Sequence, residues 1–129
     1  MARIAARLNL SLELVSEVFV VDGEQLELVV GSQRLHQARS RGTEQVALLV
    51  AAGRQAAGLD DSWTETERIR EWCDLYRRYD AANFASTIRG MDDVFNIRGP
   101  SRNRTVRLTP NGWRRAAALV VELVDAGAA

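Results

Sequence analysis

Arginine is the residue type in this chain with the clearest capacity for binding chemistry, because six arginines fall between positions 98 and 115. A guanidinium group presents five N–H donors in a planar fork that matches the oxygens of a phosphate or a carboxylate. The cluster therefore indicates an anionic partner, either a nucleic acid or an acidic protein surface. Its members are Arg98, Arg102, Arg104, Arg107, Arg114 and Arg115.

Residues suited to catalysis are scarce. One Cys and one His cannot complete a structural zinc site, and the absence of Lys excludes Schiff-base and phosphate-loop lysine chemistry. Cys73 lies in an apolar helical pattern, which predicts a buried, unreactive thiol. Asp92 and Asp93 would point about 100° apart on a helix, with no evident third metal ligand. We expect no enzymatic activity, no catalytic residues, no metal and no cofactor.

Charge is unevenly distributed along the chain, although the formal net charge is zero. Residues 76–115 carry nine Arg against three Asp, whereas residues 1–75 carry eight Arg against twelve acidic residues. No apolar run approaches the roughly 18 residues that a membrane helix needs, and the first residues lack the apolar core of a signal peptide. We expect a cytoplasmic protein that binds no membrane.

The first 38 residues predict a small antiparallel sheet. Apolar and polar residues alternate strictly over residues 8–14, which favours a strand with one buried face. A helix is the alternative, because Ile4, Leu8, Leu12 and Val15 also fall near helical spacing. Residues 18–21 and 25–30 flank an Asp-Gly dipeptide and predict a β-hairpin, and a second turn at residues 31–32 precedes a further short strand.

Three helices, two strands and a last helix follow. Helical patterns cover residues 43–57, with Thr43 as the cap, and residues 64–76, with Ser62 or Thr64 as the cap. A third helix over residues 81–93 follows Asp80. Residues after 95 become extended, residues 104–108 alternate, and Thr109-Pro110 begins a helix that continues to about residue 126. The 129 residues suit one domain of the α+β class.

Residues 80–113 resemble the second half of a winged helix-turn-helix domain, and the resemblance extends over residues 43–126. It implies a DNA-binding protein, a transcriptional regulator, with residues 81–93 as the recognition helix and residues 98–107 as the wing. Arg89 would contact guanine and Asn83 adenine, while Ser86 and Thr87 suit phosphates. The implied DNA-binding residues are Asn83, Ser86, Thr87, Arg89, Arg98, Arg102, Arg104 and Arg107.

Two features complicate this interpretation. The helical wheel places Asp93 on the face that would enter the major groove, where its carboxylate would be repelled by phosphates. Arginine also binds carboxylates, so the alternative function is a winged-helix adaptor that docks an acidic protein partner without DNA.

The last helix is apolar on more than one side. Its residues could bury that surface within the domain or in a homodimer.

Overall fold

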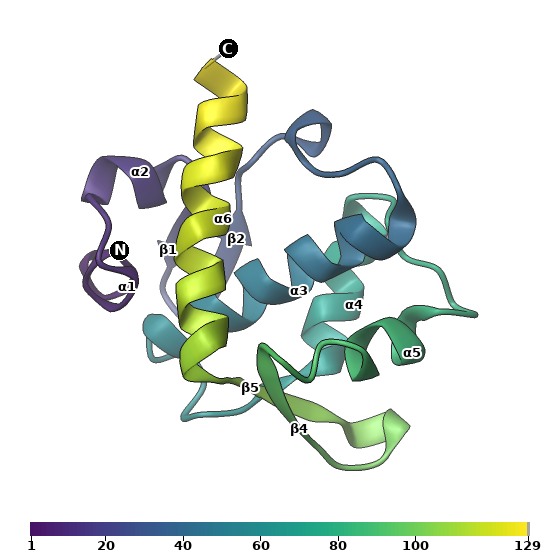
Figure 1. Cartoon of the computed structure of the whole chain (residues 1–129). Coiled ribbons are helices and arrows are strands. Elements are labelled where there is room, and N and C mark those ends of the chain that lie inside the picture. The colour runs from purple at the N-terminus through teal and green to yellow at the C-terminus, as the bar shows by residue number, and fades with distance from the viewer. Residues whose placement is uncertain (129) are drawn as a thin grey trace.

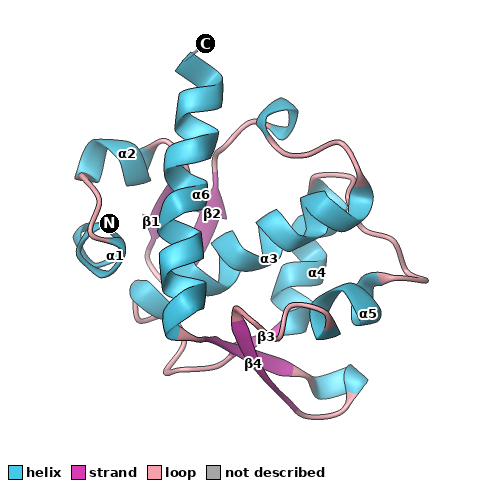
Figure 2. Cartoon of the chain, viewed as in Figure 1, coloured by secondary structure: helices cyan, strands magenta, loops and turns pink. Residues whose placement is uncertain are grey.

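The computed structural model describes residues 1–128 and has the predicted α+β architecture, in which helices pack beside two small antiparallel sheets (Figures 1 and 2). The elements are α1 (Ala2–Leu8), α2 (Leu12–Ser16), β1 (Phe19–Asp22), β2 (Gln25–Leu28), η1 (Ser32–Arg34), α3 (Arg39–Ala56), β3 (Thr64–Glu65), α4 (Thr66–Leu75), α5 (Phe84–Arg89), β4 (Phe95–Arg98), η2 (Ser101–Asn103), β5 (Thr105–Leu108) and α6 (Pro110–Ala128), where η marks a 3-10 helix.

Helix α3 lies at the centre of the molecule. Every residue from Val46 to Gly53 is buried, so the helix is covered on all sides rather than along one stripe. Helices α1, α4, α5 and α6 pack against it, together with strands from both sheets. Figure 1 shows α3 crossing the middle of the view, with α6 beside it and α4 behind its other end.

The three-stranded sheet has the order β3-β5-β4, with antiparallel neighbours. Its inner face buries Phe95, Val106 and Leu108 at 5% exposure or less. Its outer face carries exposed Arg98 and Arg107, because side chains alternate along a strand. The short strand β3 was not predicted. It joins the loop between α3 and α4 to the β4–β5 hairpin.

Helix α6 begins where the sequence predicts. The N–H of Gly112 donates to Oγ1 of Thr109 at 3.0 Å, which caps the helix, and Pro110 takes its first position. The apolar arc of α6 packs on α1, α2 and α3 of the same chain, and Leu119 and Leu123 are nearly fully buried. The apolar surface that motivated a homodimer is therefore covered within this chain.

The strand predicted over residues 8–14 is wrong, because this segment forms parts of two short helices. Asn9 ends α1 in the left-handed region with φ 56°, and Oγ of Ser11 accepts from the N–H of Leu14 to cap α2. The alternating leucines share no buried face, since Leu8 is 4% exposed and Leu12 is 52% exposed. The helical alternative holds as far as Ser16.

The hairpin predicted around Asp22-Gly23 is confirmed, with Asp22 paired to Gln25 across a tight turn. Gly23 takes the positive φ of 62° that such a turn needs. The strand predicted after residue 32 is wrong, because Ser32–Arg34 forms a 3-10 helix. The N-terminal sheet therefore consists of a single hairpin in this part of the chain.

Three predicted helix boundaries need correction. Helix α3 begins at Arg39, so Thr43 lies inside the helix, where it is buried and donates to the carbonyl oxygen of Arg78. Helix α4 begins at Thr66, because the two residues before it pair with β5. The helix predicted over residues 81–93 is regular only from Phe84 to Arg89, with hydrogen-bonded turns on either side.

Candidate nucleic-acid interface

Helix α5 presents its polar side chains as predicted from the helical wheel. Ile88 is 1% exposed and faces α3, whereas Ser86 and Arg89 are exposed on the opposite side. Thr87 is half-buried and lines a cavity of about 260 Å³ with Arg39 of α3. Ser86 and Arg89 are therefore the α5 side chains most open to a partner, and Thr87 is less accessible than either.

The start of α5 carries a carboxylate. Nδ2 of Asn83 donates to Oδ2 of Asp80 at 2.8 Å, and the N–H of Ala82 donates to the other oxygen. The hydrogen bond from the Asn83 side chain lowers the pKa of Asp80 below its usual value, so the Asp80 carboxylate stays negatively charged. The Asn83 amide is therefore engaged within the chain, and an anion approaching α5 at this end meets a negative charge.

The β4–β5 hairpin separates its arginines into two groups. Arg98 and Arg107 project from the outer face of the sheet, whereas exposed Arg102 lies in η2 at the tip. Arg104 follows η2, is half-buried, and its Nε has no hydrogen-bond partner. Gly99 takes φ 92° at the turn, where an added Cβ would also meet the carbonyl oxygen of Asn103 at 2.8 Å.

Trp63, immediately before β3, holds both sheet arginines. The guanidinium carbon of Arg98 lies 4.0 Å from the centroid of the Trp63 ring, and that of Arg107 lies 4.8 Å from it. Both distances are within the range of a cation–π interaction. Without β3 nothing in the sequence places Trp63 beside Arg107.

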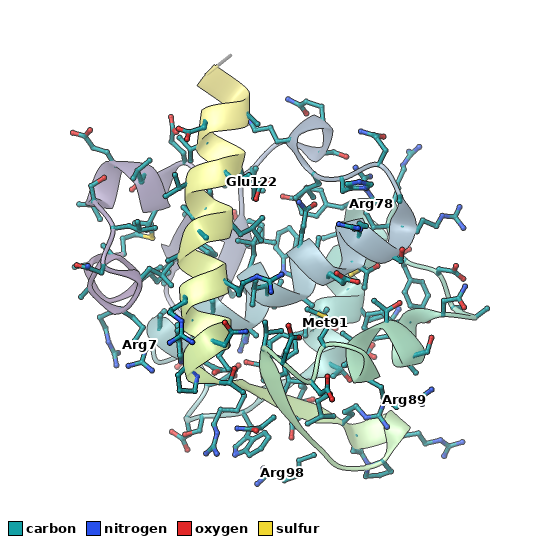
Figure 3. The ribbon with its side chains drawn as sticks, in the orientation of Figure 1. Arg7, Arg78, Arg89, Met91, Arg98 and Glu122 are labelled. Carbon is teal, nitrogen blue, oxygen red and sulfur yellow. The ribbon has the colours of Figure 1, made fainter. Side chains whose placement is uncertain are left out.

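The four arginines of the β4–β5 hairpin lack an acidic partner among the residues that the structure describes. None of the ion pairs within residues 1–128 involves Arg98, Arg102, Arg104 or Arg107. Outside the sheet, the guanidinium carbon of Arg7 in α1 lies 4.2 Å from the ring centroid of Trp113 near the start of α6. In Figure 3, Arg7, Arg98 and Arg89 lie along the lower part of the view, below the bulk of α3 and α6. None of these three arginines forms an ion pair with a residue that the structure describes.

The carboxylate of Asp93 does not lie on α5. It follows the end of that helix and pairs with Arg115 of α6, with 3.6 Å between the carboxylate and guanidinium atoms. Its carbonyl oxygen accepts from the side chains of Thr109 and Asn111, which fastens the segment to the start of α6. The position predicted from a longer helix is therefore wrong, and the repulsion expected there is offset by Arg115.

No match was found with protein-family models, with curated proteins or with solved structures.

Cys73 is the one thiol of the chain. Cys73 is fully buried, as predicted, and burial raises the pKa of its thiol to about 11, so the thiolate is disfavoured at neutral pH. No cluster of three His, Cys, Asp or Glu side chains suited to a metal ion occurs within the described residues. None of the helices described is both long and apolar enough to cross a bilayer.

Proposed function

We propose that this chain is a winged helix-turn-helix protein that binds double-stranded DNA and acts as a transcriptional regulator in the cytoplasm. Helices α3, α4 and α5 form the helical part, α5 is the recognition helix, and the β4–β5 hairpin is the wing. The observation that carries the proposal is the sheet order β3-β5-β4.

That sheet order supports a winged helix for a topological reason. A strand between the first and second helices pairs with the second wing strand, so the three-stranded sheet closes one end of the three-helix unit. This helix–strand–helix–helix–strand–strand arrangement is typical of winged-helix domains. The third strand fixes the hairpin beside the helices. Two strands alone would form an isolated hairpin, which is only marginally stable in water.

The charges of the two elements suggest different roles. Arg89 on exposed α5 suits a bidentate contact with guanine, and Ser86 suits a phosphate. The unpaired arginines of the wing suit phosphates, which supply affinity and orientation without sequence preference. We assign base contacts to α5 and backbone contacts to the wing.

The first test is fluorescence anisotropy of a labelled duplex of about 30 base pairs, titrated with the protein at several salt concentrations. A wing that contacts about four phosphates gives a log–log slope near −3.6, so affinity falls roughly a hundredfold between about 50 and 200 mM salt. Absence of binding at the lowest salt concentration would contradict the proposal.

Two variants separate the assigned roles. Replacing Arg102 and Arg104 together with Ala should weaken binding similarly on all duplexes and reduce the slope by about 1.8, because two phosphate contacts are lost. Arg89→Ala should instead change the order of preference among duplexes, by about 1–3 kcal/mol at the base that it contacts. Arg68→Ala is the control, because Arg68 is an exposed arginine on α4 outside the proposed interface. An Arg102/Arg104 variant that binds as the parent does would show that the wing is wrongly assigned.

One observation favours the second candidate, a winged-helix adaptor that binds protein and not DNA. Asp80 holds a negative charge at the start of α5, where a recognition helix meets phosphates in the proposed DNA complex. The adaptor predicts no duplex binding at physiological salt and an acidic protein surface docked on the wing arginines. The same titration therefore distinguishes the two functions.

A further inference from the structure

The outer face of the three-stranded sheet brings one aromatic ring and two arginines together through strand register. Thr64 pairs with Val106 and Glu65 with Thr105, so continuing this register by one residue places Trp63 opposite Arg107. Arg98 pairs with Thr105, two residues before Arg107 on the same face, and is its diagonal neighbour. Strand pairing therefore sets this cluster, with the two arginines on different strands of the hairpin.

The cluster holds two positive charges that form no ion pair with a described residue, although exposed Glu65 lies on the same face of the sheet. Both guanidinium groups lie within 5 Å of one ring centroid, yet neither forms an ion pair with any residue described. Two like charges held close together repel each other, and an anion bound between them offsets that repulsion. A phosphodiester backbone provides such anions in series.

We propose that Trp63 is a positioning residue for nucleic-acid binding, holding Arg98 and Arg107 ready for the phosphate backbone, so that the outer face of the β3-β5-β4 sheet binds phosphate as well as the wing tip. This inference rests on the proposed function and adds a surface that the tip arginines alone do not provide. The ring contributes no charge. Its effect comes from limiting the conformations of two long side chains before the DNA arrives.

The expected effect follows from the cost of ordering those side chains. Without the ring, Arg98 and Arg107 keep their charges but sample several rotamers, and each must be ordered on binding. The resulting loss of affinity is roughly tenfold for the pair. The salt dependence stays nearly unchanged, because the number of neutralised phosphates is the same.

The experiment compares Trp63→Leu and Trp63→Phe with the parent in the duplex titration. Trp63→Leu should bind roughly tenfold more weakly with the parent's salt slope, and Trp63→Phe should recover most of the loss because it keeps an aromatic face. A variant with Arg98→Gln and Arg107→Gln should instead reduce the slope by about 1.8, because two charges are removed. Trp72→Leu is the control, since Trp72 stacks on Tyr76 and no arginine lies over its ring.

Each outcome supports or overturns the proposal. If the parent binds no duplex, the proposed function and this inference both fail. If the parent binds and Trp63→Leu matches it, only the role of Trp63 fails. A Trp63→Leu slope as shallow as that of the double arginine variant, or a Trp63→Phe loss equal to that of Trp63→Leu, also overturns positioning by the ring.

A measurement on the parent protein alone guards against a misfolded variant. Protons close to the face of an indole ring resonate upfield, so the δ-methylene protons of Arg98 and Arg107 should be shifted upfield from those of exposed Arg68. Unshifted resonances would show that the arginines do not rest on Trp63 in solution. The inference would then fail, whatever the result of the DNA titration.

Discussion

At the scale of single residues, Arg78 shows that the count of charged residues in a segment does not measure the charge that is exposed to a partner. It contributes to the basic excess of residues 76–115, but only 6% of it is exposed. Its guanidinium donates to the carbonyl oxygens of His36, Tyr76 and Ser32 and to Oγ of Ser32. It thereby fastens the segment before α3 to the end of α4, and its guanidinium group is enclosed by the chain (Figure 3).

Replacing Arg78 with Met should lower the free energy of unfolding by about 3 kcal/mol, because several buried carbonyl groups lose a charged donor. Arg78→Lys should recover little, because a single ammonium group cannot reach acceptors spread around a planar guanidinium. Urea unfolding of both variants checks this. Arg77→Met is the control, because Arg77 is exposed and equally close to α4. An Arg78→Met loss no larger than that of Arg77→Met would contradict a stabilising role for the buried guanidinium.

At the scale of elements, the joint between β4 and α6 sets where the β4–β5 hairpin lies. The N–H of Thr109 donates to the carbonyl oxygen of Val94 at 2.9 Å, which continues the pairing of β4 with β5 to the start of α6. Gly112 then lies against the same carbonyl, because an added Cβ would overlap the oxygen of Val94 and come within 3.3 Å of Cβ of Leu108. The helix approaches the strand this closely only without a side chain there.

Gly112→Ala should therefore destabilise the protein by about 1–3 kcal/mol, since α6 must move away from β4. Thermal unfolding monitored by circular dichroism measures this. Gly90→Ala is a matched control, because its φ is −71° and the nearest atoms lie 3.5 Å from the added Cβ. That change should alter stability by less than about 1 kcal/mol. Equal effects of the two substitutions would show that the contact at Gly112 is not a constraint.

The elements that the sequence predicted well carry strong local signals. The hairpin around Gly23 and the start of α6 at Thr109-Pro110 follow from residues that leave the backbone few alternatives. The two-residue strand β3 has no periodicity of its own and exists because β5 pairs with it. The place of Trp63 in the candidate site depends on that pairing, so neither could be predicted from local pattern.

In the N-terminal segment the error had another cause, because a periodic pattern was followed in place of local helix signals. Four alternating leucines favoured a strand. Two local signals favour helices instead, because left-handed Asn9 ends α1 and the Ser11 cap begins α2. The outward position of Ser86 and Arg89 could be predicted, because helical periodicity alone decides it. The engagement of Asn83 with Asp80, three residues apart, depends on the irregular turn before α5.

At the scale of the whole molecule, the exposed face of α6 determines how two copies could associate. The apolar residues of α6 are covered by α1, α2 and α3, which leaves a polar stripe open to solvent. That stripe is basic near its start, at Arg114 and at Arg115, which also pairs with Asp93, and acidic further along, at Glu122 and Asp125. Two copies of this helix can therefore pair favourably only antiparallel, with opposite charges facing each other.

We expect a homodimer of this kind to be weak and to dissociate as salt rises, because exposed ion pairs are screened within about 8–10 Å at 0.1–0.15 M ionic strength. Sedimentation equilibrium without DNA should detect association at low salt and loss of it above about 0.5 M. Replacing Glu122 and Asp125 with Arg should abolish association even at low salt, because every facing pair becomes repulsive.

The control for that charge reversal changes net charge equally at a different place. Glu13 and Glu17 are exposed at α2, away from the polar stripe of α6, so replacing both with Arg should leave association unchanged. Adding Arg114→Glu and Arg115→Glu to the reversed helix should restore pairing, because the facing charges are opposite again. A dimer that persists in about 1 M salt would instead require an apolar interface, and the polar stripe of α6 would not be its site.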